Sequence, residues 1–309
     1  MNIDLDPRTS LPNDADRACL VGRAWVPGTP PGPSVLLVDG EEVIDISHGY
    51  ATTSLLLECV DPAAAARSAA ARGARLGRLT DILANTSADR HDPGRPRFLA
   101  PCDLQALKAC GVTFVSSLLE RVIEEKTKGD PGQADEVRRT LMDAIGIDLS
   151  AVRPGSTEAA KVKELLVQRG LWSPYLEVGI GPDAEVFTKS QPMSAVGTGA
   201  EIGLHPASTW NNPEPEIVLA VNSRGQTVGA TLGNDVNLRD FEGRSALLLG
   251  KAKDNNGSCA IGPFIRLFDD HFGIDDARLA EVGLEIAGDD QFSLRATSSM
   301  SKISRDPLE

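Results

Sequence analysis

The sequence predicts an α+β protein rich in β-strand, in which a helical middle segment lies between two parts made of short strands. Three patterns along its 309 residues indicate this. Short apolar runs broken by Pro and Gly fill the first hundred residues, and apolar residues recur at helical spacing between residues 116 and 169. From about residue 184, short β-type runs alternate with Gly, Asn and Pro, which is typical of strands joined by loops.

A small N-terminal α/β domain is expected over residues 1–98. Apolar runs at residues 34–38 and 54–57 indicate strands, and an Ala- and Arg-rich stretch near residues 62–84 indicates a helix. The Pro- and Gly-rich segment HDPGRPRFLAP at residues 91–101 is the best candidate for a linker, because it offers turn residues between two apolar segments.

The remaining elements follow from the change of periodicity. Helices are expected at residues 116–128, 135–145 and 158–169, because each places apolar side chains on one face and charges on the other. Strands are expected in four later runs, Ala184–Lys189, Ala200–Leu204, Pro215–Val236 and Ser258–Phe268.

Composition excludes several classes of function. The formal charge of -13 and the pI of about 4.8 repel nucleic-acid phosphates and anionic membranes, and basic residues form no stripe. No apolar window approaches the roughly 18 residues of a spanning helix, and the N-terminus lacks a signal pattern, so a cytoplasmic protein is expected. The cysteines lack CxxC spacing and indicate buried free thiols rather than a disulfide framework or a zinc site: Cys19, Cys59, Cys102, Cys110 and Cys259.

Three carboxylates are expected to meet at the open end of a hairpin. Glu214 and Glu216 lie two residues apart at the start of an apolar strand, so a period of two directs both side chains to one face. The strand runs into the turn Asn222–Gly225 and returns toward Asp235. Because the midpoint between residues 216 and 235 falls beside this turn, Asp235 is folded back to the two glutamates.

Such a cluster requires protonation, basic neighbours or a cation, since uncompensated carboxylates raise one another's pKa. Mg²⁺ is the expected cofactor because it prefers oxygen ligands and keeps positions for water or substrate, with Mn²⁺ or Ca²⁺ as possible substitutes. On spacing alone, solvated acidic residues at a hairpin end explain the pattern equally well.

Four motifs in order give a more specific indication, because the segment from residue 100 to 305 resembles the fumarylacetoacetate hydrolase superfamily. That family has a Pro-Glu-Leu-Phe-x-Lys strand, a Glu-x-Glu strand, an Asn-Asp-x-x-x-Arg-Asp turn and a Lys about ten residues before Gly-Pro. The corresponding stretches here are Ala184–Lys189, Glu214–Glu216, Asn234–Asp240 and Lys253–Pro263.

The resemblance implies a mixed β-sandwich or roll core over residues 99–309, with a smaller N-terminal domain and assembly as a homodimer. It implies Mg²⁺ bound by Glu214, Glu216 and Asp235, and Lys253 beside the oxygens of a 2-keto acid substrate. The family normally continues beyond a segment like residues 295–304 to further strands, so a chain ending at residue 309 is expected to be truncated at its C-terminus.

The expected chemistry depends on one missing histidine. The hydrolytic branch carries a water-activating His in the segment that corresponds to residues 110–121, and this chain has none there. The sequence is similar to the branch that dehydrates 2-keto-3-deoxy sugar acids such as pentonates, with 2-oxoglutarate semialdehyde as the product. A C–C hydrolase of an acylpyruvate or 2,4-diketo acid, and a non-catalytic binding relative, stay open as alternatives.

The hypothesis for catalysis assigns a role to each polar group. The cation would chelate the substrate's carboxylate and C2 carbonyl and stabilise an enolate as a Lewis acid, and Lys253 would support the same charge. Glu185 is the first choice for the general acid/base, with a structural role beside Lys189 as its alternative. Glu120 and Glu124 are the reserve candidates.

Four further residues are candidates for substrate binding. Phe114 and Ser117 would line the pocket, although a core aromatic ring and a helix N-terminal hydroxyl explain them equally well. Arg239 and Glu242 follow Asp235 on a loop where the family places polar residues that face the substrate. A structural ion pair with Asp240 or another neighbour is the preferred alternative for Arg239.

Overall fold

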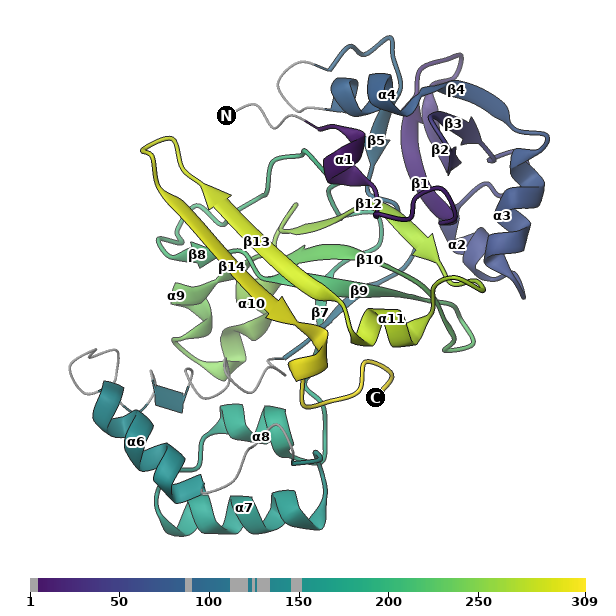
Figure 1. Ribbon diagram of the computed structural model, residues 1–309. Coiled ribbons are helices and arrows are strands. Elements are labelled where there is room, and N and C mark those ends of the chain that lie inside the picture. The colour runs from purple at the N-terminus through teal and green to yellow at the C-terminus, as the bar shows by residue number, and fades with distance from the viewer. Residues whose placement is uncertain (1–4, 87–90, 112–121, 124–125, 127–133, 146–151) are drawn as a thin grey trace. The chain divides into compact units, whose positions relative to one another are not determined.

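A computed structural model describes residues 5–86, 91–111, 122–123, 126, 134–145 and 152–309 (Figure 1). In these residues, no helix is long and apolar enough to cross a membrane. The chain forms two compact units. The first comprises residues 1–107, 188–277 and 282–297, and the second comprises residues 108–187, 278–281 and 298–309.

An eight-stranded sheet forms the centre of the first unit. Its strand order is β4-β3-β2-β1-β12-β10-β9, with β5 also paired to β1, and its ladders are antiparallel. The strands are β1 (Leu20–Val26), β2 (Gly32–Asp39), β3 (Glu42–Asp45), β4 (Ala74–Arg78), β5 (Arg97–Leu99), β9 (Pro215–Val221), β10 (Thr227–Asp235) and β12 (Cys259–Leu267). Because β1 pairs with β12, the sheet continues across the boundary predicted near residue 98.

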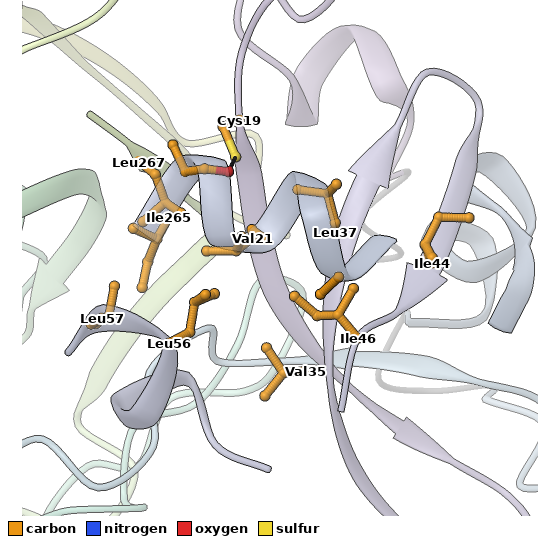
Figure 2. Close-up of a cluster of buried hydrophobic side chains, with 13 residues drawn as sticks. Cys19, Val21, Val35, Leu37, Ile44, Ile46, Leu56, Leu57, Ile265 and Leu267 are labelled. Carbon is orange, nitrogen blue, oxygen red and sulfur yellow. Dashed lines mark hydrogen bonds between the residues drawn. The ribbon is translucent and has the colours of Figure 1, made fainter. Parts of the chain in front are cut away.

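Both faces of the sheet are buried at its central strands β1 and β2, which explains their continuous apolar runs. In β2, Val35 and Leu37 pack into one cluster, while Leu36 and Val38 pack into another, as the period of a strand requires. The first cluster includes side chains of α2 (Thr53–Leu57) and α3 (Pro62–Ala70) (Figure 2). The second includes side chains of α4 (Leu79–Thr86).

The structure departs from the expected elements at three places, and capping explains the first of them. Residues 54–57 were expected to form a strand but form α2, because the Thr52 hydroxyl accepts from the Leu55 amide at 3.1 Å and Asp103 accepts from the amide of Thr53 at 2.7 Å. The single helix expected near residues 62–84 was also wrong, since β4 separates α3 from α4. Residues 200–204 form no strand.

The rest of the first unit consists of short elements around the sheet. They are α1 (Pro7–Ser10), β8 (Asn211–Asn212), β11 (Asn237–Leu238), α9 (Arg239–Glu242), η3 (Ala246–Leu248), α10 (Leu249–Lys253) and α11 (Ile274–Arg278), whose last residue falls in the second unit. β8 pairs with β11, and β13 (Glu281–Ala287) pairs with β14 (Ser293–Ser299). The last two residues of β14 and the following η4 (Met300–Lys302) belong to the second unit. The chain leaves the first unit through β6 (Leu107–Cys110) and returns through β7 (Val186–Ser190).

Helices dominate the second unit. The predictions at residues 135–145 and 158–169 are confirmed by α6 (Ala134–Ile145) and α7 (Thr157–Gln168), and α8 (Pro174–Ile180) joins them around a buried apolar cluster. The buried Arg305 donates from Nε to the carbonyl of Val178 at 3.0 Å, which fastens the last residues of the chain to α8. The helix expected at residues 116–128 lies mostly outside the described residues.

Candidate active site

The hairpin of β9 and β10 brings Asp235 to the two glutamates, as the sequence predicts. Its turn lies at residues 222–226, where Gly225 has a φ of 74°, a left-handed conformation that favours glycine. In the ladder, Glu216 lies opposite Gly233, and the Asp235 amide donates to the Glu214 carbonyl at 2.9 Å. Asp235 is therefore joined to Glu214 directly.

Two asparagines of the β8–β11 ladder orient the Glu214 carboxylate. Asn237 donates from Nδ2 to Glu214 Oε1 at 3.0 Å and to Glu242 Oε2 at 2.6 Å. Asn212, its partner in the ladder, donates to the same Glu214 oxygen at 3.3 Å. The Glu214 amide in turn donates to Asn234 Oδ1 at 3.0 Å. These contacts fix both the backbone and the side chain of Glu214 before any ligand binds.

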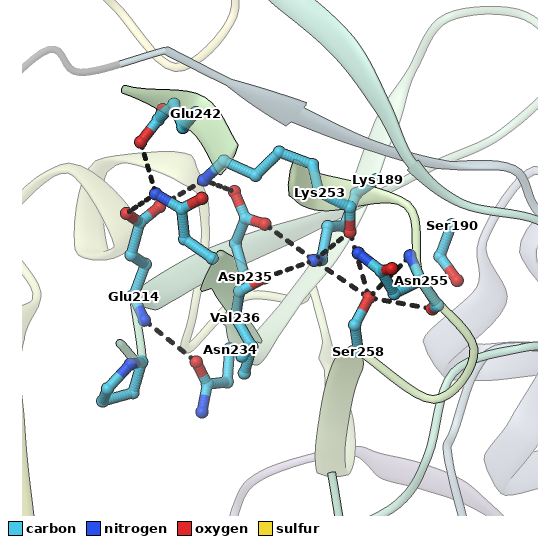
Figure 3. Close-up of polar contacts among 12 residues, drawn as sticks. Lys189, Ser190, Glu214, Asn234, Asp235, Val236, Glu242, Lys253, Asn255 and Ser258 are labelled. Carbon is cyan, nitrogen blue, oxygen red and sulfur yellow. Dashed lines mark hydrogen bonds and ion pairs between the residues drawn. The ribbon is translucent and has the colours of Figure 1, made fainter. Parts of the chain in front are cut away.

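The Lys253 ammonium lies between two of the carboxylates. Its Nζ is 2.5 Å from Glu214 Oε2 and 2.9 Å from Asp235 Oδ2, and Lys253 is buried (Figure 3). Burial alone would lower the pKa of Lys253, but the carboxylates of Glu214 and Asp235 outweigh it and raise that pKa. The same two effects act on Glu214. Burial favours its neutral acid, but the Lys253 charge outweighs burial and lowers the pKa of Glu214. The site therefore holds a charged lysine between the carboxylates of Glu214 and Asp235.

The Glu216 carboxylate has no comparable compensation. It makes no hydrogen bond or ion pair among the described residues. Burial, followed by the charges of Asp235 and Glu214, raises its pKa to about 8, and the Lys253 charge lowers that pKa only in part. A cation bound by these three carboxylates would offset their mutual repulsion and so lower the pKa of Glu216.

These residues fit a hard divalent cation in the type of their donor atoms. Asp235 Oδ1 is buried and accepts no hydrogen bond within the described part of the chain, although the Lys189 ammonium lies 3.1 Å away. With Glu216, it offers oxygen atoms whose coordination is unfilled, and Mg²⁺ prefers such oxygens. Within the described ranges, no three His, Cys, Asp or Glu side chains are already grouped as a metal site. Lys253 supplies the positive charge between Glu214 and Asp235 instead.

Lys189 is a site residue that sequence reasoning placed only in a strand motif. It is 1% exposed, and its ammonium donates to the carbonyls of Val236 at 2.8 Å and Lys253 at 2.5 Å, and to Ser258 Oγ at 3.2 Å (Figure 3). Burial lowers its pKa, and the charge of Asp235 acts in the opposite direction. The available signal was a lysine near the end of the short strand β7, after the apolar residues Val186 and Phe187.

The two residues predicted on the loop after Asp235 have different surroundings. Glu242 lies in the network because Asn237 links it to Glu214. The Arg239 guanidinium lies over the ring of Trp210, 5.5 Å from its centroid. Asp240, the ion-pair partner considered for Arg239, accepts from Ser208 at 2.6 Å and pairs with Arg244 at 3.5 Å.

Of the remaining predicted residues, only Glu185 falls within the described part of the chain. Glu185 is in the second unit, where its carbonyl accepts from the Gly111 amide at 2.9 Å. Four others lie outside the described residues, namely Phe114, Ser117, Glu120 and Glu124.

Known proteins similar to this chain share its fold and parts of its sequence. No protein-family model matches. A protein of Haloferax volcanii named probable 2-keto-3-deoxyxylonate dehydratase is 29% identical over 203 residues, which covers 66% of this chain and 68% of the relative. A protein of Saccharolobus solfataricus named 2-dehydro-3-deoxy-D-arabinonate dehydratase is 40% identical over 81 residues, which covers 26% of this chain and 27% of the relative.

Solved structures share the fold of this chain. A hexagonal crystal form of 2-keto-3-deoxyarabinonate dehydratase matches with a TM-score of 0.57 and 20% identity, covering 94% of this chain and 79% of the other. A structure of 2-keto-3-deoxy-D-arabinonate dehydratase complexed with magnesium and 2,5-dioxopentanoate matches with a TM-score of 0.57 and 19% identity, covering 93% and 79%. The chain is therefore similar in sequence to two proteins named as dehydratases of 2-keto-3-deoxy-pentonates, and similar in fold to solved structures of such a dehydratase.

Proposed function

We propose that this chain is a Mg²⁺-dependent hydro-lyase that removes water from a 2-keto-3-deoxy sugar acid, a pentonate. The observation that carries the proposal is Glu216, whose carboxylate makes no hydrogen bond or ion pair with the described residues, and whose pKa is raised to about 8 by burial and by the charges of Asp235 and Glu214. Two curated relatives are named as dehydratases of such acids, and a structural neighbour is complexed with magnesium and 2,5-dioxopentanoate.

Glu214, Glu216 and Asp235 would hold the cation, and Mn²⁺ or Ca²⁺ would substitute for Mg²⁺. When bound, Mg²⁺ supplies Lewis-acid chemistry toward the oxygens of a 2-keto acid. The protein prepares for this by fixing Glu214 with the two asparagines Asn212 and Asn237, so that its carboxylate is oriented before the ligand arrives. A preorganised site loses less free energy to reorganisation when it binds.

Lys253 would stabilise negative charge on the substrate. Its ammonium is buried and its pKa is raised, so it stays charged through the neutral range. A fixed positive charge in a poorly solvated site stabilises the developing enolate oxygen more strongly than water does. The same ammonium neutralises Glu214 and Asp235 in the ligand-free protein.

Glu185 is proposed to move the proton. Its carboxylate would take a proton from C3, the C4–O bond would break, and the protonated Glu185 would return the proton to the departing hydroxyl, which leaves as water. From a 2-keto-3-deoxy-pentonate this yields a C3–C4 alkene with a C5 alcohol. That product is an isomer of 2,5-dioxopentanoate. A proton shift from C5 to C3 converts it to a C4–C5 enol, and the hydroxyl proton of the enol then moves to C4 to give the aldehyde.

The test uses purified protein stripped of metal with EDTA and a panel of 2-keto-3-deoxy-aldonates, with and without Mg²⁺. Mass spectrometry is expected to show the loss of one water from a pentonate only when Mg²⁺ is present. Glu214→Ala is expected to abolish turnover, whereas Glu201→Ala, at an exposed acid outside the network, is the matched control. Release of pyruvate from a 2,4-diketo acid, with no dehydration of any aldonate, would refute the proposal in favour of a C–C hydrolase.

The assembly and the location of the protein stay predictions. Light scattering of the purified protein tests the predicted homodimer, and fractionation of cells tests the predicted cytoplasmic location.

A further inference from the structure

Lys189 is one of the largest fully buried side chains among the described residues. Moving a charged ammonium out of water is costly unless close partners compensate for the lost hydration. Each of its three N–H groups has an acceptor, and those acceptors belong to the two segments that carry the proposed metal ligand Asp235 and the proposed catalytic Lys253. This lysine therefore connects two parts of the site that are distant in the sequence.

The first connection is to the end of β10. The Lys189 ammonium donates to the carbonyl of Val236 at 2.8 Å, and its charge lies 3.1 Å from Asp235 Oδ1. One contact thus fixes the backbone directly after Asp235, and the other attracts one carboxylate oxygen. The second oxygen, Oδ2, is left facing Lys253.

The second connection is to the end of α10. The Lys253 carbonyl belongs to the last turn of this helix, where carbonyl groups lack partners within the helix. The Lys189 ammonium binds that carbonyl at 2.5 Å, and the Ser258 hydroxyl donates to it at 3.0 Å. Because the Lys253 backbone is fixed in this way, the reach of its side chain toward Glu214 and Asp235 is fixed as well.

We propose that Lys189 is a positioning residue, which sets the distance between Asp235 and the Lys253 ammonium without touching the substrate. The inference rests on the proposed function for the identity of the reaction. Its consequence for cation binding does not depend on which substrate is used.

The sign of the change in cation affinity separates this role from a simple effect of charge. If Lys189 merely added positive charge beside Asp235, its removal would make a divalent cation bind more tightly. If it positions the ligand, its removal leaves Asp235 and Lys253 free to move, and the cation binds more weakly. Loss of a group that orients a metal ligand typically weakens metal binding by roughly 10- to 100-fold.

The experiment compares wild type with Lys189→Met, which keeps a long unbranched side chain and removes the charge. Mn²⁺ is the probe, titrated without substrate and followed by electron paramagnetic resonance, with circular dichroism to verify folding. Lys251→Met is the control, because it removes the same charge from an exposed position on α10. We expect Lys189→Met to bind Mn²⁺ roughly 10- to 100-fold more weakly and to lose about 100-fold in kcat, with KM little changed, and Lys251→Met to behave as wild type.

A folded Lys189→Met protein that binds Mn²⁺ as tightly as wild type, or more tightly, overturns the proposal. If this variant does not fold, Ser258→Ala decides, because it removes the hydroxyl that shares the Lys253 carbonyl with Lys189. Weaker Mn²⁺ binding by Ser258→Ala supports the positioning network, and unchanged binding overturns it. If wild type binds Mn²⁺ but dehydrates no aldonate, the proposed function fails while the Mn²⁺ titration still tests Lys189.

Discussion

Replacing Glu216 with glutamine is expected to stabilise the metal-free protein at alkaline pH, although the change removes a proposed metal ligand. The pKa of Glu216 is raised from 4.5 to about 8, first by burial and then by the charges of Asp235 and Glu214. Between these two pH values the folded protein keeps a proton that the unfolded chain has released. The free energy of unfolding therefore falls as pH rises from 4.5, and the full penalty is present above about pH 8.

The magnitude follows from about 1.4 kcal/mol for each unit of pKa difference. The penalty is about 2 kcal/mol at pH 6 and approaches about 5 kcal/mol at pH 9, as upper limits, because water that enters the half-buried site screens the charges. Glutamine has nearly the same shape and no charge, so Glu216→Gln is expected to be more stable than wild type by an amount that grows from pH 6 to pH 9.

Urea unfolding in EDTA, followed by circular dichroism at pH 6, 7.5 and 9, measures this difference. Glu201→Gln is the control, since it removes an exposed carboxylate that contacts nothing in the network. Adding Mg²⁺ should reverse the order, because a ligand that binds the folded state stabilises wild type by mass action and the variant less. A Glu216→Gln protein no more stable than wild type in EDTA at pH 9 would refute the electrostatic reasoning.

Three further predictions follow, two from the contacts of Glu216 and Lys253 and one from the contacts of Asp103. Mg²⁺ binding at pH 7 is expected to release the proton of Glu216, so the affinity for Mg²⁺ rises up to about pH 8. Calorimetry in buffers of different ionisation enthalpy measures the number of protons released. No proton release would contradict the assignment of Glu216 as a metal ligand. Lys253→Met is expected to lower kcat by roughly 100-fold or more, while Mn²⁺ binds at least as tightly as in wild type. Weaker Mn²⁺ binding would instead show that Lys253 orients the metal ligands Glu214 and Asp235. Asp103→Ala is expected to lower the free energy of unfolding in urea by roughly 2–4 kcal/mol, because it uncaps α2 and leaves the buried Arg23 without its carboxylate. Glu42→Ala, which breaks a half-exposed ion pair, is the control. A smaller loss of stability in Asp103→Ala than in Glu42→Ala would show that the cap contributes little.

Local patterns in the sequence were sufficient for elements whose periodicity and caps agree. The strand at residues 34–38, the helices α6 and α7 of the second unit, and the hairpin with its turn at Gly225 were all predicted from spacing. Residues 54–57 were not, because an apolar run of four is equally compatible with a strand and with a buried helical turn. There, Asp103, far along the chain, caps the helix and decides the outcome.

The sequence by itself determined the identity of the acidic cluster. Glu214, Glu216 and Asp235 lie on one hairpin, where strand period and turn position are local properties that can be counted. What the tertiary structure decided is how their charges are balanced. The partners of these carboxylates come from β7, β11 and α10, across separations of 18 to 46 residues. Only the folded chain shows that the Lys253 ammonium pairs with two of the carboxylates, that the Lys189 ammonium binds the Lys253 carbonyl, and that Glu216 forms no ion pair with the described residues. Burial and distance depend on long-range packing, and neither can be read from residue order.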